Sequence, residues 1–446
     1  MSEALIEKIR TRKACIAVLG LGHVGLPTAA IFADAGYQVT GIDAKKEVVD
    51  TISSLKLDTK EPGLEEIVER VVRSGKLKAV TDTVLATKQA NVMLICVQTP
   101  LTKSREPDLS YLERASLDVA RGLAKGKLVV VVSTVPPGTV KNLVARILES
   151  ESGLKCGGDF WLAYCPERIL PGKTIQEFVE NDRLVGGFDS QSAEITVELF
   201  KTVTKGKILV ADITNAELAK LAENTFRYVN IAFANELALI CERMGADAVE
   251  VINLANTHPR VNIHRPGPGV GGPCLTKDPQ LLLRPVKQRP VQSKIIESSR
   301  SLNDHMAVHV VQLVVDALKQ AKKDVGKAKV AVLGVAYKGE VSDTTNSPAE
   351  SIIHRLMNLG VHVKAYDPYS EKTFGGQDAS NAMDALKGTD CMLIATDHKM
   401  FANLSLKKIK ALMNDNPIIV DARRIINSER AKKEGFAYYG IGFGFE

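Results

Sequence analysis

The stretch that most constrains this chain is residues 14–36, which reads as a strand, a glycine turn and a helix. The strand is ACIAVLG, the turn is LGHVG and the helix is LPTAAIFADAG. Gly20, Gly22 and Gly25 occupy the G-x-G-x-x-G positions. The first glycine allows a tight turn, the second lets a ligand approach the backbone, and the third lets helix and strand pack closely. This beginning predicts a parallel sheet built from βαβ units.

Strand patterns and helical patterns alternate on both sides of a helical middle. Before residue 212 the strand-like runs are AVLG, QVTGID, VMLICV, LVVVVST and FWLAYCP, and after residue 327 they are VAVLG, VHVKAYDP, CMLIATD and PIIVDAR. We therefore predict an α/β fold with two Rossmann-like, doubly wound parallel-sheet domains joined by a long central helix and a helical middle domain. The expected boundaries are 1–211, 212–323 and 324–446. The outer domains are candidates for distant structural copies of each other.

The middle of the chain is predicted to be mostly helical. Residues 214–244 contain no glycine or proline and show helical apolar spacing, which indicates one long helix. Thr214 and Glu217 form an S/T-x-x-E pattern, so we expect a capping box at its start. Further helix is predicted through about residue 256 and again over 290–323, with a loop rich in glycine and proline between them.

Composition and cysteine content exclude several classes of partner. The 446 residues are 45% apolar and 25% charged, and the net charge of +6 is too dilute to predict nucleic-acid binding. No apolar run reaches about 18 residues, and the N-terminus lacks the apolar region of a signal peptide, so we expect no membrane partner. The seven cysteines form no C-x-x-C pair. This argues against a disulfide framework or a metal site and for a reducing, cytoplasmic location.

The glycine turn and Asp43 together predict a dinucleotide site. Asp43 ends the strand-like run QVTGID, close to the spacing of about 20 residues at which an acid binds a ribose hydroxyl. A carboxylate at this position repels a 2′-phosphate. The expected cofactor is therefore NAD rather than NADP.

Cys274 lies in an unusual place for a thiol, the loop PGPGVGGPCLTKDP. A cysteine kept for packing normally lies inside a strand or helix. Lys277 is three residues away and would favour the reactive thiolate, and the glycines at 269, 271 and 272 would let a ligand come close. The loop predicts an activated nucleophile.

Other polar residues fall where a reaction site could form. Lys220 and Asn224 are four residues apart on the predicted long helix, so they share a face and could stabilise an oxyanion. Glu167 and Thr134 follow strand ends, where ligand sites of α/β sheets collect. NAD with a cysteine nucleophile predicts oxidation through a thioester. In the second α/β half, Lys338 heads a loop that suits a phosphate other than those of NAD.

These segments together resemble the UDP-glucose/GDP-mannose 6-dehydrogenase family over essentially the whole chain. The matching elements are GLGHVG at 20–25, CVQTP at 96–100, STVPPGT at 133–139, PE at 166–167, AELAKLAENT at 216–225, GVGGPCLTKD at 269–278 and YKGEVSDTTNSP at 337–348. The resemblance implies a four-electron oxidation of a sugar C6 alcohol to the carboxylate with two NAD. It also implies a homodimer or larger homo-oligomer through the central helix.

The resemblance also implies roles for individual residues. Cys274 would form a thiohemiacetal and then a thioester, Asp278 would position the cysteine and water, Lys220 and Asn224 would stabilise the oxyanion, and Glu167 and Thr134 would serve the hydrolytic water. The implied NAD contacts are Gly20, Gly22, His23, Val24, Gly25, Asp43, Thr99, Thr134 and Lys277. The implied substrate contacts are Glu167, Arg168, Lys220, Asn224, Arg260, Gly272, Lys338 and Arg423, with Arg260 reaching a neighbouring subunit's substrate.

The sugar is less clearly indicated than the reaction. The segment HPRVNIHRPGPGVGG resembles the UDP-N-acetyl-mannosamine and UDP-N-acetylglucosamine branch, whereas the lysine of GGPCLTKD resembles UDP-glucose enzymes. We expect a UDP-N-acetyl-hexosamine, with UDP-glucose as the alternative. Thr345 stands where the family often has arginine. Two rival functions are a 3-hydroxyacid-type dehydrogenase, which needs no thiol, and an NAD-sensing protein without turnover.

Overall fold

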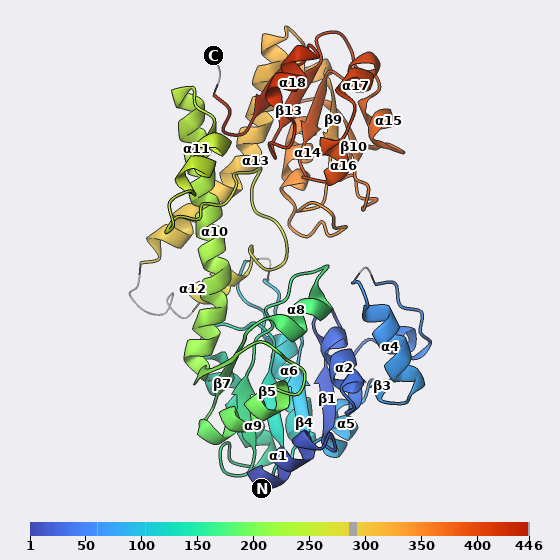
Figure 1. Cartoon of the computed structure of the whole chain (residues 1–446), viewed down its shortest axis with the longest axis vertical. Helices are drawn as coiled ribbons and strands as arrows, with labels where there is room; N and C mark the ends of the chain where they lie inside the picture. Colours follow the sequence, from blue (N-terminus) through green and yellow to red (C-terminus); the bar gives the residue numbers. More distant parts are fainter. Residues whose placement is uncertain (60, 103, 285–291, 445–446) are drawn as a thin grey trace. The chain divides into compact units, whose positions relative to one another are not determined.

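The computed structural model describes residues 1–59, 61–102, 104–284 and 292–444, which form two compact units (Figure 1). Unit 1 comprises Met1–Ala222 and the described part of 280–291. Unit 2 comprises Glu223–Pro279 and the described residues from Gln292 onward. The division falls inside a single long helix, α10 (Ile213–Met244).

Unit 1 is built on an eight-stranded sheet, counted over the described residues, in the order β3-β2-β1-β4-β5-β6-β7-β8. Its strands are parallel except for the antiparallel pair β6 and β7. The strands are β1 (Cys15–Leu19), β2 (Gln38–Ile42), β3 (Leu77–Val80), β4 (Val92–Ile95), β5 (Leu128–Val131), β6 (Trp161–Tyr164), β7 (Arg183–Gly187) and β8 (Ile208–Asp212). The helices are α1 (Ser2–Arg10), α2 (Gly25–Asp34), α3 (Lys46–Ser53), α4 (Leu64–Arg73), α5 (Thr83–Gln89), α6 (Ser110–Gly122), α7 (Ala145–Ser152), α8 (Thr174–Glu180) and α9 (Ser190–Phe200).

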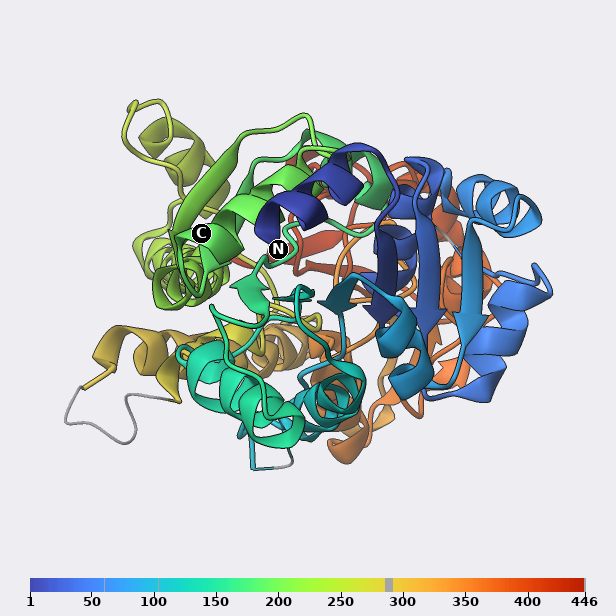
Figure 2. The same ribbon diagram turned by 90° about the horizontal axis from the view of Figure 1, so that it is seen from below.

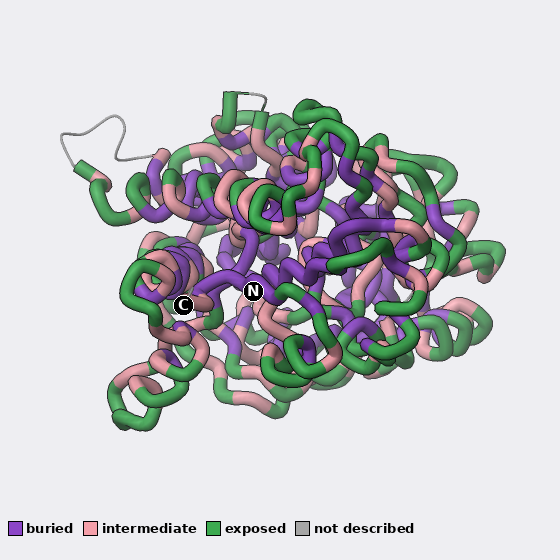
Figure 3. The backbone as a smooth tube through the Cα atoms, turned by 90° about the horizontal axis from the view of Figure 1, so that it is seen from above, coloured by how far each residue is buried: buried purple, intermediate pink, exposed green. Residues whose placement is uncertain are grey.

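The sheet of unit 1 has a core on each face. In β1, Ile16 and Val18 enter one apolar core while Ala17 and Leu19 enter the other, because successive side chains of a strand point to opposite faces. The central strands are therefore continuous apolar runs, as a sheet covered on both sides requires. Figure 3 colours the chain by residue burial, with buried residues in purple and exposed residues in green. Helix α1 packs beside α9 (Figure 2), where Arg10 and Glu198 pair at 2.9 Å.

Unit 2 repeats the topology of unit 1. Its described strands form a six-stranded parallel sheet in the order β11-β10-β9-β12-β13-β14, which matches the order of β3-β2-β1-β4-β5-β6 and is the Rossmann order. The strands are β9 (Lys329–Leu333), β10 (His362–Tyr366), β11 (Gln377–Asp378), β12 (Cys391–Ile394), β13 (Ile418–Asp421) and β14 (Ala437–Gly440). The helices beside them are α14 (Pro348–Asn358), α15 (Ala382–Leu386), α16 (Lys399–Ala402), α17 (Leu406–Leu412) and α18 (Ser428–Lys433). The predicted pair of doubly wound domains is confirmed.

The helical middle follows the prediction except at one cap. The helices are α10, α11 (Ala248–Ala255), α12 (Asp278–Leu283) and α13 (Lys294–Gln320), so the stretch expected over 290–323 is shorter, and residues 290–291 lie outside the described residues. The prediction of a capping box from Thr214 and Glu217 was wrong. Asp212 Oδ1 accepts the N–H of Asn215 at the start of the helix, and the Glu217 carboxylate accepts N–H groups of a loop distant in sequence. Over the described parts of the chain, no helix is long and apolar enough to cross a membrane.

Candidate active site

The glycine turn of unit 1 lies at the point where the strand order reverses, between β1 and β4. Gly20 has a φ of +88°, and a Cβ added there would lie 2.9 Å from the carbonyl oxygen of Cys96. A Cβ on Gly25 would lie 1.7 Å from the carbonyl oxygen of Gly20, so neither position tolerates a side chain. A Cβ on Gly22 would meet nothing within 4 Å, so its backbone borders open space. Ligands of open α/β sheets bind at such switch points.

The residues after this turn fit a dinucleotide pyrophosphate. Gly22 and His23 are exposed, and Val24 takes the N-cap position of α2. Among the described residues, no side chain caps this helix, and its first turn contains no acid. The helix N-terminus therefore keeps its partial positive charge for an anion.

Asp43 follows β2 and hydrogen-bonds the glycine turn. Its Oδ2 accepts the N–H of Leu21 at 2.9 Å, and its Oδ1 accepts the N–H of Lys45 at 2.9 Å. The carboxylate is partly exposed, so a remaining lone pair can face a ligand. Asp43 thus stabilises the turn in addition to the ribose contact predicted for it.

The loops after β4 and β5 are joined by hydroxyl groups. Thr99 Oγ1 donates to the carbonyl oxygen of Thr134 at 2.6 Å, and Ser133 Oγ donates to the carbonyl oxygen of Val97 at 2.6 Å. Thr99 is buried and Thr134 is partly exposed. The two predicted NAD contacts therefore belong to one hydrogen-bonded pair of loops at the same edge of the sheet.

Glu217 holds the loop STVPPGT from the first turns of α10. Its carboxylate accepts the N–H groups of Gly138 (2.5 Å) and Val140 (2.9 Å), just before the π-helical turn Val140–Val144 and α7. The side chain is fully buried, and this burial raises the pKa of Glu217 to about 7. Sequence reasoning missed this role because the S/T-x-x-E spacing pointed to a local cap.

Glu167 lies in a buried ion pair. Its Oε2 is 3.2 Å from Nη1 of Arg183, and its Oε1 accepts the N–H of Arg168 at 2.9 Å. Arg183 extends from β7, where its guanidinium lies 3.9 Å from the ring centroid of Phe178 and donates to Thr204 Oγ1 at 2.7 Å. Sequence reasoning missed Arg183, although a charged residue in the strand RLVGG signals a buried partner.

Cys274 occupies an exposed turn directly before α12 in unit 2. The N–H groups of Lys277 and Asp278 donate to its carbonyl oxygen at 3.0 and 2.9 Å, which closes the turn. Asp278 is only 2% exposed, and its Oδ2 accepts the Nδ2 of Asn224 at 2.6 Å. The structure therefore brings together Cys274, Asp278 and Asn224 among the predicted catalytic residues of unit 2.

The glycines of the cysteine loop make room for an aromatic ring of the chain itself. A Cβ on Gly271 would lie 2.7 Å from the Cβ of Tyr337, and one on Gly272 would lie 2.8 Å from its ring. Gly272 also has a φ of +87°, and its N–H donates to the carbonyl oxygen of Thr345 at 2.8 Å. The missing side chains of Gly271 and Gly272 therefore make room for Tyr337, and the ligand approach expected at these glycines stays a prediction.

The remaining predicted residues differ in their surroundings. Lys220 is buried on α10, four residues before Asn224, and Arg260 is exposed in the loop after α11. Lys338 Nζ lies 5.9 Å from the ring centroid of Tyr337. Arg423 donates to the carbonyl oxygens of Ala395 at 3.1 Å and Tyr337 at 3.0 Å. Within the described ranges, no group of His, Cys, Asp and Glu is arranged to hold a metal ion.

A glycine turn at the switch point of a Rossmann sheet defines unit 1 as a dinucleotide-binding unit. Comparison with known proteins then identifies the chain. Residues 14–204, 214–305 and 331–428 match the NAD binding, central and UDP binding domains of the UDP-glucose/GDP-mannose dehydrogenase family. The chain belongs to this family, as the sequence motifs predicted, and it is an NAD-dependent oxidoreductase.

Individual relatives agree with this family. The UDP-N-acetyl-D-mannosamine dehydrogenase of Pyrococcus horikoshii is 44% identical over 96% of this chain and 99% of its own. A solved structure of UDP-D-ManNAc dehydrogenase from the same organism is similar with a TM-score of 0.90 at 42% identity, covering 96% of this chain and 99% of that one. A UDP-glucose dehydrogenase from Pyrobaculum islandicum is similar with a TM-score of 0.86 at 29% identity, covering 96% and 98%.

Proposed function

We propose that this protein oxidises the C6 alcohol of a UDP-N-acetyl-hexosamine, UDP-N-acetyl-mannosamine or UDP-N-acetylglucosamine, to the uronate. The observation that carries the choice of sugar is the 44% identity with a UDP-N-acetyl-D-mannosamine dehydrogenase over nearly the whole chain. UDP-glucose is the second candidate, because the Pyrobaculum islandicum UDP-glucose dehydrogenase has a similar fold with a TM-score of 0.86.

Cys274 is the proposed nucleophile of a two-step, four-electron reaction. When bound, NAD accepts one hydride in each of the two oxidations. The first oxidation converts the alcohol to an aldehyde, and the thiolate of Cys274 adds to its carbonyl carbon to give a thiohemiacetal. Loss of a second hydride from that carbon gives a thioester, and water cleaves it to release the carboxylate and the thiol. The exposed position of Cys274 supports this role.

Asn224 and Lys220 are the proposed donors to the substrate oxyanion. A carboxylate can only accept, so the amide nitrogen of Asn224 faces Asp278. That nitrogen carries a second hydrogen, which can donate to the developing oxyanion. Lys220 lies one helical turn earlier on α10 and would add a positive charge. Asp278, held by Asn224, would fix the turn that carries Cys274.

Glu167 and Thr134 are proposed to serve the hydrolytic water. Because Glu167 pairs with Arg183 and also accepts the N–H of Arg168, we assign it the task of orienting water as a hydrogen-bond acceptor. Unit 2 would bind the UDP moiety through Lys338, Arg423 and Gly272, and Arg168 would contact the sugar. The exposed Arg260 would reach the substrate of a neighbouring subunit.

Helix α10 is the proposed surface of a homodimer. Phe226, Phe233, Ile240 and Met244 are between 52% and 75% exposed. Phe226, Phe233 and Ile240 are seven residues apart and Met244 follows four residues later, so these side chains lie on one face of the helix and form one apolar stripe. Exposed apolar stripes of this kind mark interaction sites. The cytoplasmic location stays a prediction from the cysteine content.

The test is the stoichiometry of NADH formation with a panel of UDP- and GDP-sugars. We expect two NADH per sugar with an N-acetyl-hexosamine and weaker use of UDP-glucose. One NADH with release of free aldehyde would exclude the thioester route and favour a simple dehydrogenase. Cys274→Ser should abolish acid formation while NAD still binds, and normal turnover in that variant would remove the cysteine from the reaction.

A further inference from the structure

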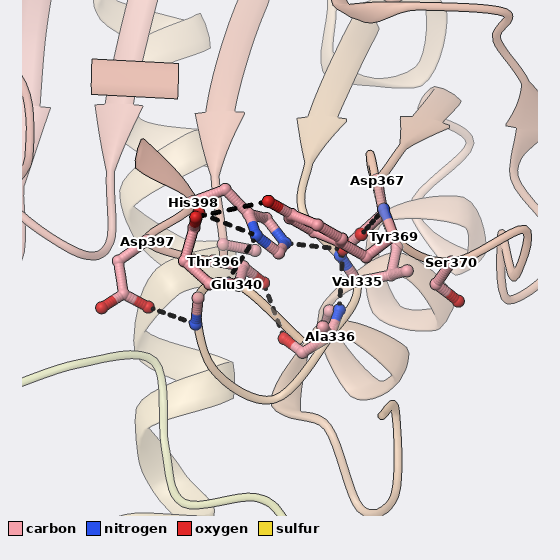
Figure 4. A network of polar contacts seen from close by, with 12 residues as sticks. Val335, Ala336, Glu340, Asp367, Tyr369, Ser370, Thr396, Asp397 and His398 are labelled. Atoms are coloured by element: carbon pink, nitrogen blue, oxygen red, sulfur yellow. Dashed lines mark hydrogen bonds and ion pairs between the residues drawn. The ribbon is translucent and has the colours of Figure 1, made fainter. Parts of the chain in front are cut away.

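The loop after β9 in unit 2 is held by a buried carboxylate and a buried histidine (Figure 4). Asp367 Oδ2 accepts the N–H groups of Val335 at 2.7 Å and Ala336 at 3.0 Å. The same oxygen is 3.0 Å from Nε2 of His398, and neither side chain is exposed. The hydrogen bonds with His398 and the backbone N–H groups outweigh burial and lower the pKa of Asp367.

The hydrogen bonds define the tautomer of His398. The N–H of Glu340 donates to Nδ1 at 3.0 Å, so Nδ1 carries no proton. Nε2 then carries the proton and donates it to Asp367. The imidazole is therefore a neutral link between the strand end at Asp367 and the loop at Glu340.

Glu340 needs this support because its backbone is in an unfavourable conformation. Its φ is +62°, in the left-handed region that a residue with a side chain rarely adopts. Its carboxylate accepts the N–H of Lys399 at 2.9 Å and the hydroxyl of Tyr369 at 3.3 Å. Strained residues persist only where the surroundings determine them, and they cluster at functional sites.

The comparison with unit 1 shows that Asp367 serves a different purpose from Asp43. Gly20 donates to the carbonyl oxygen of Ile42 at 2.8 Å, and Gly334 donates in the same way to Tyr366 at 2.8 Å, so the two turns correspond. The side chain of Asp43 is partly exposed, whereas that of Asp367 is fully buried. Asp367 therefore acts within the fold, on loop 335–340, on His398 and on the N–H of Tyr369.

The same loop also contacts the cysteine loop. Tyr337 packs against Gly271 and Gly272, and its carbonyl oxygen accepts from Arg423 at 3.0 Å. Burial raises the pKa of Tyr337 to about 12, with further contributions from Asp343 and Cys274. A shift of the loop would move Lys338 and the support of Cys274 together.

We propose that Asp367 and His398 are positioning residues that hold loop 335–340, so that Lys338 meets the substrate diphosphate and Tyr337 supports the Cys274 loop. Neither residue touches the reacting atoms. The assignment of Lys338 and Cys274 rests on the proposed function. The physical link from His398 through the loop to Gly272 rests on the contacts alone.

The test compares His398→Phe, His398→Asn and a control, His362→Phe, in the full-length protein. Phenylalanine keeps an aromatic ring beside Tyr369 and Phe401 but loses both hydrogen bonds. Asparagine can restore the acceptor for Glu340. His362 is exposed at the opposite end of β10 and serves as the matched control. The readouts are UDP affinity, NAD affinity and the rate at which iodoacetamide alkylates Cys274, assigned by peptide mass spectrometry.

We expect His398→Phe to weaken UDP binding about tenfold or more, which corresponds to about 1.4 kcal/mol, and to change the alkylation rate of Cys274 several-fold. NAD affinity should stay unchanged. His398→Asn should restore part of the UDP affinity and bring the alkylation rate of Cys274 closer to that of the unaltered protein. Should His398→Phe fail to fold, Thr396→Val replaces it, because Thr396 Oγ1 donates to the carbonyl oxygen of Ala336 at 2.7 Å.

An unchanged UDP affinity or an unchanged alkylation rate in the folded variant would overturn the proposal, as would an equal loss of NAD affinity. Absence of UDP binding by the unaltered protein would count against the proposed function instead. The alkylation rates would then still test the link between His398 and the Cys274 loop.

Discussion

Asn224 Nδ2 donates a hydrogen bond of 2.6 Å to Oδ2 of Asp278. This bond connects helix α10 to the first residue of α12, four positions after Cys274. Because Asp278 is almost completely buried, its charge depends on partners supplied by the protein. The amide of Asn224 is thus hydrogen-bonded to the turn that carries Cys274.

Removing this bond should destabilise the protein. Asn224→Ala takes a donor from a buried carboxylate and should cost about 1–3 kcal/mol. Asn224→Asp places a second carboxylate against Asp278 and should cost more, with loss of turnover in both variants. Urea unfolding and NADH assays measure the two effects. If Asn224→Asp were no less stable than Asn224→Ala, the new carboxylate would meet no repulsion, and Asp278 would not be charged.

Asp43 should control both cofactor choice and the stability of the glycine turn. Asp43→Asn keeps an acceptor for the N–H of Leu21 but loses the charge, so it should narrow the preference for NAD over NADP with little change in melting temperature. Asp43→Ala should lose both the charge and the acceptor, so it should narrow the preference for NAD and also lower the melting temperature. Cofactor titrations and thermal melting separate the two contributions. Comparable use of NADP by the unaltered enzyme would contradict a carboxylate at the ribose.

Glu167→Gln should slow thioester hydrolysis and lower the free energy of unfolding of unit 1. We expect a burst of NADH followed by a covalent adduct on Cys274, detected by intact-mass spectrometry of the quenched enzyme. The variant also leaves Arg183 buried without its counter-charge, a loss of up to about 3–5 kcal/mol.

The double variant Glu167→Gln, Arg183→Met is the control for stability. Removing both charges should lower the free energy of unfolding less than removing one, because no buried charge is left unpaired. An adduct in both variants assigns hydrolysis to Glu167. If both the burst and the adduct are missing, Glu167 acts before hydrolysis.

Glu217 should make unit 1 less stable as the pH rises. Its pKa is about 7 in the folded protein and 4.5 in the unfolded chain, so the native carboxyl group holds its proton more tightly than the unfolded one. Its contribution is fully present below pH 4.5 and is lost as the pH rises through 7, in total about 3 kcal/mol.

The single tryptophan, Trp161, lies buried in β6 and reports unfolding of unit 1 by fluorescence. Urea unfolding between pH 5 and 8 should show the decline in the unaltered protein and a flatter profile in Glu217→Gln. The same slope in both proteins would assign the pH dependence to other groups.

The apolar stripe of α10 should hold the proposed homodimer. Phe233→Glu puts a charge in the middle of the stripe and should shift the protein toward monomer in light scattering. Met357→Glu is the matched control, since Met357 is 39% exposed on α14 and should leave the mass unchanged. An unaltered mass in Phe233→Glu would exclude this face as the interface.

Local sequence patterns were sufficient for the architecture and for the cofactor turn. The strand, glycine turn and helix of residues 14–36 report contacts within a few residues, and the alternation of apolar runs predicted both doubly wound sheets. The motifs and their order also predicted the family, which the three matched domains confirm. The roles assigned to Cys274, Lys220 and Glu167 stay predictions, because they concern a reaction.

Only the tertiary structure decided which distant side chains meet. Glu217 binds Val140, 77 residues away in sequence, instead of capping its own helix. Gly272 makes room for the ring of Tyr337, and Asp367 is enclosed by His398, although its place after β10 matches that of Asp43 after β2. Periodicity tells which face of an element is buried. The partner that fills that face depends on how the elements pack, and no local pattern records it.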